Sequence, residues 1–498
     1  MKKIRFYQTF SIIIVLTMVV QVISLLRTTA LATNFGISND MDAFNFANTA
    51  MVCLVNIMGP SVATVLIPFL AKMRDGIEDR NILNTYITAI MAITYMLLLT
   101  YFIIGSIYFF AGSSSHGLTF QELTFLLTFI LGIAQYTRLI SSIQTAFLQM
   151  DGKFIIIKVV AVISAILSYI YIIITPNLSI MEAAICIGLS YVVECIGLIF
   201  SNKNKKYKYR AKFKWADAEF RKLMRLTVPV TLNSVIYQVT VLLPNILARF
   251  FGEGYISTMV YANQIISIMQ TLIIINLISM LYPTLTRSFN RSIEEAKKKL
   301  VLFINGSNML VIPMISGMMM LGGLVIKVLF ERGNFTHDST IIVWQFLIFL
   351  SLALPFVVIR EFIFKAFYAM GDTKTPVKNS LVVIIIQIVF LTAGSFWIGV
   401  YAIMLSPLLA AVLSTILGYR DLRKKIGPLG KNGEMIKQHL LTIFNSLVMC
   451  AGIWGVMQVV HFNTIINLVI YIGVGIAIYS ICVLLTQRKY VKTLLNNR

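Results

Sequence analysis

Long apolar segments follow one another along the whole chain, and short polar segments separate them. A helix needs about 20 residues to cross the roughly 30 Å of hydrocarbon in a bilayer, and windows of that length predict fourteen membrane-spanning helices. The apolar runs are continuous and do not alternate over about ten residues, so helices are favoured over the strands of a barrel. The predicted spans are 7–33, 41–70, 82–110, 119–149, 155–174, 178–200, 223–249, 257–287, 298–327, 339–369, 377–396, 398–418, 438–459 and 463–486.

The composition agrees with an all-α integral membrane protein. Of the 498 residues, 58% are hydrophobic and 12% charged, whereas about a quarter of the residues in a soluble domain are charged. The first apolar run, 6–26, is longer than the h-region of a signal peptide, so we expect it to be retained as a helix. The five cysteines lie in apolar runs without a CxxC pattern, and we expect buried thiols rather than disulfides or metal ligands.

Lysine and arginine are concentrated in alternate connections between the predicted spans. They occur in the connections 71–81, 150–154, 201–222, 288–297 and 419–437. Four of the opposite connections contain neither residue type, at 34–40, 111–117, 175–178 and 461–464, and Arg332 is the exception on that side. Cytoplasmic loops collect lysine and arginine, so both termini are predicted to lie in the cytoplasm. The net charge of +22 therefore reflects topology and does not indicate nucleic-acid binding. The cluster 203–214 is either a solvated loop or a segment lying on anionic headgroups.

The chain contains an internal repeat. The segment Leu31–Gly36 (LATNFG) matches Leu247–Gly252 (LARFFG), Phe46-Ala47-Asn48 then matches Tyr261-Ala262-Asn263, and Pro68 matches Pro283. The repeat covers six spans, an even number, so both copies have the same orientation in the membrane. Transporters use such lobes, related by an axis along the membrane normal. We therefore predict a lobe at 1–200, a basic linker at 201–222, a second lobe at 223–425, and two further helices and a tail at 426–498.

Arg27 is an ionisable residue within the first apolar run. Such a group is costly in a membrane segment and marks a functional site by default. Its side chain could extend to the membrane surface, but the end of the span near Asn34 is about 10 Å away at 1.5 Å per residue. If Arg27 instead faces an aqueous cavity, its guanidinium suits a phosphate, which it can bind through two parallel hydrogen bonds.

Asp42 lies in the first turn of the second span. It either interacts favourably with the dipole at that helix start or faces the pore. If it faces Arg27, the two groups could exchange partners during transport.

Signatures of enzymes are absent from the sequence. The four histidines, His116, His337, His439 and His461, are scattered at predicted loops or helix ends without an HExxH motif. There is also no Walker A pattern. We predict that the chain is not an enzyme and has no cofactor. Its energy would come from an ion gradient, the membrane potential or the gradient of the substrate itself.

Three segments carry a resemblance to a known family. They are Arg27-x-x-x-Leu31-Ala32-x-x-Phe35-Gly36 followed by Asp42-Ala43-Phe44, the segment 329–336 (LFERGNFT), and the segment 371–378 (GDTKTPVK). Together they resemble the motifs of the MurJ-type (MviN) lipid II flippases, which belong to the superfamily of multidrug, oligosaccharidyl-lipid and polysaccharide exporters. The resemblance implies fourteen helices, two lobes around a cationic cavity, and translocation of an undecaprenyl-pyrophosphate-linked sugar by alternating access. It also places Arg27 on a cavity arginine of the family and Asp42 on an acidic residue.

The sequence departs from the family pattern at several cavity positions. The pair Asn263-Gln264 stands where the family usually has Asp-Arg, while Gln21, Val55 and Asn56 fall on arginines of the family. The loss of these cations is consistent with a paralogue that carries a different lipid-linked glycan. Asn263 and Gln264 would offer neutral hydrogen bonds to the substrate.

The predicted function is therefore a flippase for a polyprenyl-(pyro)phosphate-linked precursor of a cell-envelope glycan, in the inner (cytoplasmic) membrane. The predicted substrate-binding residues are Arg27, Asp42, Asn263 and Gln264, with no metal site. Expected partners are a lipid-linked oligosaccharide, membrane lipids and envelope-synthesis enzymes. The alternatives are an exporter of capsular, exopolysaccharide or teichoic-type repeat units, a multidrug exporter, a membrane glycosyltransferase or polymerase, and a scaffold of envelope assembly that does not transport.

Overall fold

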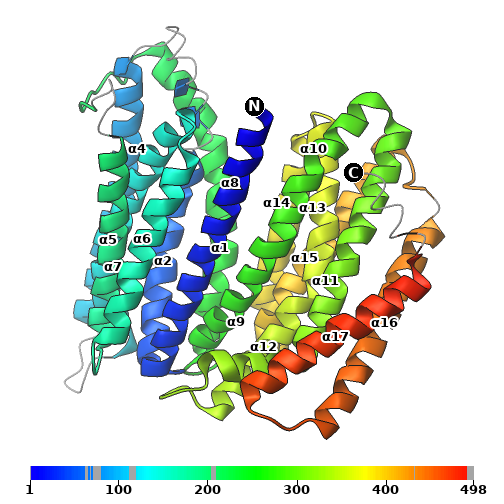
Figure 1. Cartoon of the computed structure of the whole chain (residues 1–498). Helices are drawn as coiled ribbons and strands as arrows, with labels where there is room; N and C mark the ends of the chain where they lie inside the picture. The colour runs from blue at the N-terminus through cyan, green and yellow to red at the C-terminus, as the bar shows by residue number, and fades with distance from the viewer. Residues whose placement is uncertain are drawn as a thin grey trace. The chain divides into compact units, whose positions relative to one another are not determined.

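The computed structural model describes residues 2–61, 65–67, 69–70, 80–111, 119–202, 209–430, 432–488 and 490. Parts of the sequence analysis lie outside these ranges: Pro68, His116, residues 71–79 of the connection 71–81, residues 203–208 of the cluster 203–214, residue 431 of the connection 419–437, and the tail 491–498. Within the described ranges the secondary structure is helical, which confirms the all-α class (Figure 1).

The helices follow one another in the order of the predicted spans (Figure 1). They are α1 (Lys2–Phe35), α2 (Asn39–Ser61), α4 (Arg80–Ala111), α5 (Phe120–Met150), α6 (Phe154–Ile174), α7 (Ile180–Ser201), α8 (Ala218–Phe250), α9 (Tyr255–Met269), the π-helix η2 (Gln270–Ile275), α10 (Asn276–Arg291), α11 (Ile293–Phe330), α12 (His337–Leu352), α13 (Leu354–Ala369), α14 (Lys374–Ile398), α15 (Tyr401–Ile426), α16 (Asn432–Val459) and α17 (Thr464–Thr486).

Twelve helical segments of the described chain are long and apolar enough to cross a membrane, with the stretch His337–Ala369 counted as one. The two other predicted spans, 41–70 and 257–287, correspond to α2 with the residues that follow it, and to α9, η2 and α10. The chain is therefore a multi-pass membrane protein, and the count of fourteen remains a prediction.

Two of the predicted spans are irregular helices. The span 257–287 changes to a π-helical turn at Gln270–Ile275 before α10 begins. The span 339–369 is divided at Ala353, where α12 ends, and Pro355 lies in the first turn of α13. A proline is tolerated in a first turn because that backbone position lacks an intrahelical partner for its N–H in any case. Hydropathy alone predicted both spans as continuous.

The backbone contacts divide the chain into two compact units, Met1–Ser257 and Thr258–Arg498. In the first unit α5 packs against both α2 and α7, and α6 packs against both α1 and α7. Helix α8, which begins at Ala218, packs against α2 and α4 in this unit. The predicted boundaries of the two lobes, 1–200 and 223–425, stay predictions.

In the second unit, α11 is the helix around which the others assemble. It packs against α10, α12, α13, α16 and α17. Helix α17 and Tyr490, which follows it, are also held to α11 by hydrogen bonds from tyrosine side chains to backbone carbonyls. The hydroxyl of Tyr479 donates to the carbonyl of Met309 at 2.6 Å, and that of Tyr490 donates to the carbonyl of Leu302 at 2.8 Å.

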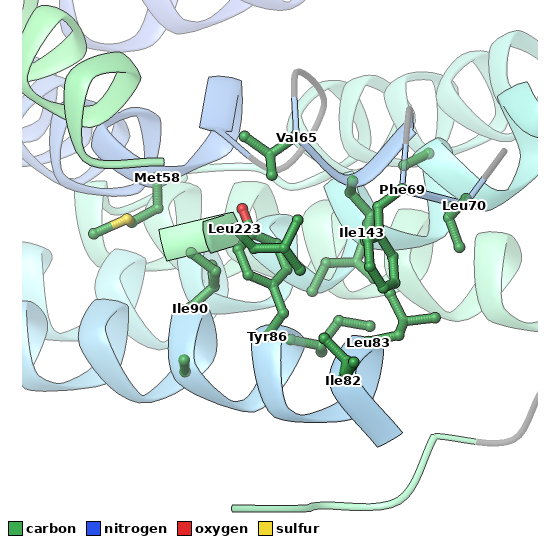
Figure 2. Close-up of a cluster of buried hydrophobic side chains, with 14 of the residues drawn as sticks. Met58, Val65, Phe69, Leu70, Ile82, Leu83, Tyr86, Ile90, Ile143 and Leu223 are labelled. Carbon is green, nitrogen blue, oxygen red and sulfur yellow. The ribbon is translucent and has the colours of Figure 1, made fainter. Parts of the chain in front are cut away.

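An apolar cluster holds one end of the first unit together (Figure 2). It joins Met58 of α2, Tyr86 of α4, Ile143 of α5 and Leu223 of α8, together with residues after α2 such as Phe69. The buried Tyr86 hydroxyl lies 3.0 Å from Thr227 Oγ1 of α8, so its polar end has a partner inside the cluster. All five cysteines of the chain are free thiols; Cys53, Cys186 and Cys195 are buried, as predicted, whereas Cys450 and Cys482 are only partly buried.

Candidate functional site

Arg27 lies on α1 about two turns before the helix ends at Phe35, and its side chain is partly buried. Its Nη1 donates to Ser168 Oγ of α6 at 3.4 Å. The carbonyl of Ser168 accepts a hydrogen bond from Cys186 Sγ of α7 at 3.6 Å. The guanidinium is therefore placed beside the junction of α6 and α7.

The guanidinium of Arg27 has no ion-pair partner among the residues that the structure describes, and its one hydrogen bond there goes to a neutral hydroxyl. A guanidinium carries five N–H donors, so most of its donor capacity is available. A cation with spare donors at the depth of a membrane span can bind an anion such as a phosphate.

Asp42 is fully buried and forms three short hydrogen bonds. Its Oδ2 accepts from the backbone N–H of Gly254 at 2.6 Å. Its Oδ1 accepts from the backbone N–H of Ser257 at 2.7 Å and from Ser257 Oγ at 2.5 Å. The side-chain amide of Asn45, one turn further along α2, donates to the same Ser257 hydroxyl at 3.4 Å. We call this arrangement the Asp42 clamp.

The Asp42 clamp caps the start of α9, because the two backbone N–H groups belong to its first turn or to the residue before it. A carboxylate is stabilised at a helix N-terminus by the unpaired N–H groups and the helix dipole. Asp42 thus interacts with the dipole of α9, and the structure does not bring it together with Arg27. Arg249 in the last turn of α8 adds an electrostatic interaction with the carboxylate.

Position 254 of the Asp42 clamp requires a glycine for two reasons. Its φ of +86° lies in the left-handed region, which a glycine adopts without steric cost. In addition, a Cβ at this position would lie 2.0 Å from Ile37 Cγ2, so a larger residue would clash.

Asn263 and Gln264 lie in α9 and belong to the second unit. Asn263 is exposed, and its side-chain amide donates to the carbonyl of Met259 in its own helix at 2.9 Å. Gln264 is partly buried. The side-chain carbonyl oxygens of both residues can still accept hydrogen bonds. Their contact with the substrate stays a prediction.

The segment 371–378, one of the three that carry the family resemblance, builds the turn between α13 and α14. Gly371 has a φ of +74°, and Asp372 Oδ1 accepts from the backbone N–H groups of Lys374 at 3.1 Å and Thr375 at 3.0 Å. Asp372 Oδ2 accepts from Lys425 Nζ of α15 at 2.6 Å. The hydrogen bond from Lys425, followed by those from Thr375, lowers the pKa of Asp372 to about 2.

The segment 329–336 likewise builds a turn, between α11 and α12. Gly333 has a φ of +58°, and Thr336 Oγ1 accepts from the backbone N–H of Ser339 at 3.3 Å, which caps α12. Glu331 accepts from Thr340 Oγ1 at 2.8 Å. The residues of both segments therefore have structural roles in the turns where they lie.

Sequence reasoning missed the partners of Asp42. A signal for one of them is present in the repeat, because the offset that aligns Phe46 with Tyr261 also aligns Asp42 with Ser257, 215 residues later. Two equivalent positions can come together where they lie near a two-fold axis. Gly254 carried no comparable signal, since its role depends on the position of Ile37.

The chain resembles known proteins over most of its length. The sequence model of the family described as lipid II flippase MurJ matches residues 6–474. A probable lipid II flippase MurJ of Rickettsia prowazekii is 26% identical over 212 residues, which is 42% of each chain. The corresponding protein of Vibrio cholerae is 24% identical over 327 residues, 62% of this chain and 61% of the relative. The alignments thus span about two fifths to three fifths of the length of these two relatives.

Solved structures show the same fold. A lipid II flippase MurJ in an inward closed conformation matches with a TM-score of 0.80 at 20% identity, over 96% of this chain and 99% of that one. An inward-facing multidrug resistance transporter of the MATE family, in the MOP superfamily, matches with a TM-score of 0.63 at 15% identity, over 82% and 96%. With the family model covering residues 6–474, the chain belongs to the MurJ family.

Proposed function

We propose that this chain is a flippase that moves a polyprenyl-(pyro)phosphate-linked glycan precursor across the cytoplasmic membrane by alternating access. Membership of the MurJ family supports the proposal. The observation in the molecule that carries it is the guanidinium of Arg27, which lies in a membrane helix without an anionic partner among the described residues.

A physical barrier explains why such a protein is needed. The headgroup of the precursor is rich in hydroxyls and carries phosphate charge, and each polar group that enters hydrocarbon without a partner costs several kcal/mol. A polar path along the protein lets the headgroup cross while the prenyl tail remains in the lipid. Arg27 would bind the phosphate groups by charge-assisted hydrogen bonds.

The Asp42 clamp would act as a gate in this cycle. Its three hydrogen bonds hold the loop before α9 and the first turn of that helix against α2. In alternating access, such bonds would form in one state and break in the other. Because the bonds come from a charged group, they stabilise the clamped state strongly enough to bias the equilibrium between the two states.

The identity of the glycan can differ from lipid II. Val55, which falls on an arginine of the family, is buried in the apolar cluster of the first unit. The exposed Asn263 and the partly buried Gln264 stand where the family usually has Asp-Arg. These neutral residues favour the second candidate function, the export of a capsular, exopolysaccharide or teichoic-type lipid-linked unit. Both termini would lie in the cytoplasm, and the coupling energy would come from an ion gradient or the membrane potential.

Replacement in cells tests the proposal. The chain is expressed in a strain depleted of its essential lipid II flippase, and in a second strain that lacks a polysaccharide exporter. Growth or polymer export in one of the two strains is the expected result, and the strain that is rescued identifies the class of glycan. Failure in both, with the protein present in the membrane fraction, contradicts the proposal.

A charge series at Arg27 tests the binding site in the strain that is rescued. Arg27→Lys should retain partial function, because lysine keeps the positive charge but not the paired hydrogen bonds. Arg27→Ala and Arg27→Glu should abolish function, because alanine lacks the charge and glutamate repels phosphate. Arg332→Ala is the matched control, since that exposed arginine lies in the turn after α11 and donates to the carbonyl of Val328 in the last turn of the helix. Full activity of Arg27→Glu excludes the phosphate-binding role.

A further inference from the structure

A second polar site lies within the first unit, apart from Arg27 and the Asp42 clamp. It is a pocket of about 210 Å³ between α2, α5 and α7, which we call the polar pocket. Its lining residues are Gly59 of α2, Arg138, Ser141, Ser142, Thr145, Ala146 and Gln149 of α5, and Glu194 of α7.

The polar pocket contains one charge of each sign. The guanidinium carbon of Arg138 lies 4.8 Å from the centre of the Tyr191 ring of α7. Glu194 interacts electrostatically with Arg138 and with Lys158 of α6, but neither cation forms an ion pair with it within the described ranges. Opposite charges that line one pocket at membrane depth without direct contact leave their hydrogen-bonding capacity to a molecule between them.

The neutral residues of the polar pocket add further unused capacity. The hydroxyl of Ser142 donates to the carbonyl of Arg138 at 3.0 Å, so its oxygen remains an acceptor. In the part of the chain that the structure describes, the side chains of Thr145 and Gln149 have no hydrogen bond. The pocket therefore presents donors and acceptors together.

This set of groups fits a sugar ring better than a phosphate. A cavity needs about 10–15 Å³ to hold one water molecule, so a cavity of about 210 Å³ is large enough for a group of the size of a hexose. The charges of Arg138 and Glu194 cancel, so the pocket does not favour an anion. A carboxylate accepts hydrogen bonds from neighbouring hydroxyls, a guanidinium donates to hydroxyl or acetamido oxygens, and an amide does both.

We propose that the polar pocket binds a sugar residue of the glycan headgroup. The inference rests on the proposed flippase function and deepens it, because it assigns glycan recognition to Arg138 and Glu194 and phosphate binding to Arg27. Glu194 lies eight residues after Cys186 on α7, which is about 12 Å along the helix at 1.5 Å per residue and about 80° around it. Since Arg27 contacts Ser168 beside Cys186, one headgroup can reach both sites.

The polar pocket opens near the ends of the helices that form it. Gln149 is one residue before the end of α5, Gly59 is two before the end of α2, and Glu194 is seven before the end of α7. The ends of α5 and α7 precede connections that contain lysine, and the predicted span 41–70, to which α2 belongs, leads into a basic connection. The charge pattern therefore places this side of the pocket toward the cytoplasm. A precursor made in the cytoplasm would meet this site as it loads.

Binding to the purified full-length chain in lipid nanodiscs tests the inference with two probes. One, the glycan probe, is the lipid-linked glycan of the class that the rescued strain identifies, with a shortened prenyl chain, and the other is the matching prenyl pyrophosphate without sugar. Glu194→Gln and Arg138→Gln should weaken binding of the glycan probe roughly tenfold, as expected for the loss of a charge-assisted hydrogen bond. Both should leave prenyl pyrophosphate binding unchanged, whereas Arg27→Ala should weaken the binding of both probes.

A third variant blocks the polar pocket without altering a charge. A Cβ added at Gly59 has no neighbour within 4 Å, so Gly59→Leu should fill the pocket and preserve the fold. It should also reduce binding of the glycan probe selectively. Gly433→Leu is the matched control, because a Cβ there also has no neighbour within 4 Å and α16 is remote from the pocket in sequence.

The outcomes separate the two proposals. Equal losses for both probes, or no loss with Gly59→Leu and Glu194→Gln, overturn the assignment of the polar pocket. Prenyl pyrophosphate binding without any gain from the sugar also overturns it, but leaves the flippase function in place. Failure of the unmodified chain to bind either probe overturns both.

Discussion

The Asp42 clamp gives a prediction whose size follows from its geometry. In Asp42→Asn, one carboxylate oxygen becomes an NH2 group that must face the N–H of Gly254 or the N–H and hydroxyl of Ser257, all of which donate at present. The variant therefore loses at least one charge-assisted hydrogen bond, and the remaining bonds become neutral. A hydrogen bond to a charged group is worth about 1.5–3 kcal/mol. We expect Asp42→Asn to lower the free energy of unfolding by about 2–4 kcal/mol.

The partner residue allows a double-mutant cycle. Ser257→Ala removes the hydroxyl donor at 2.5 Å from Asp42 Oδ1 but keeps the backbone N–H at 2.7 Å, so it should cost about 1.5–3 kcal/mol. In the double variant, the hydroxyl bond is lost only once. The losses of unfolding free energy in the two single variants should therefore sum to more than the loss in the double variant, with a coupling energy of about 1–2 kcal/mol.

Denaturant unfolding of the purified protein in mixed micelles measures these values. Asp40→Asn is the matched control, because Asp40 is an exposed carboxylate in the same first turn of α2. If Asp42→Asn unfolds at the same denaturant concentration as Asp40→Asn, or if the two single costs simply add, the clamp does not stabilise the fold and the reasoning is wrong.

Two further predictions concern turns. Gly254→Ala should destabilise the protein by more than 1 kcal/mol, because φ is +86° and the new methyl group meets Ile37; a melting temperature equal to that of the unmodified chain would contradict this. Asp372 has a pKa lowered from 3.8 to about 2, chiefly by Lys425, so its contribution to stability is fully present above pH 3.8 and is lost as the pH falls toward 2. The difference in stability between the unmodified chain and Asp372→Asn, followed by thermal unfolding, should therefore be constant near neutrality and shrink in that acidic range, and a difference that grows there would be inconsistent with the sign.

The local features of the chain were accessible from its sequence. Whether a segment spans a membrane depends on its own length and apolarity, so twelve of the predicted spans coincide with helical segments long and apolar enough to cross a membrane. Arg27 was identified because a charge in an apolar run stands out by itself. The three family segments were also found from the sequence, and the predicted spans placed 329–336 and most of 371–378 in connections between helices. The contacts of Glu331 with Thr340 and of Asp372 with Lys425 were not predicted, since they depend on the tertiary fold.

The tertiary structure alone decided which distant residues meet. Asp42 and Ser257 are 215 residues apart, and Arg138 and Glu194 lie on helices that neither hydropathy nor charge pairs with each other. Apolar runs all resemble one another, so hydropathy specifies that a helix enters the membrane but not which face it presents to which neighbour. Packing of side chains fixes those faces. For this reason the sequence determined the class of the protein and its helices, and the fold determined the Asp42 clamp and the polar pocket.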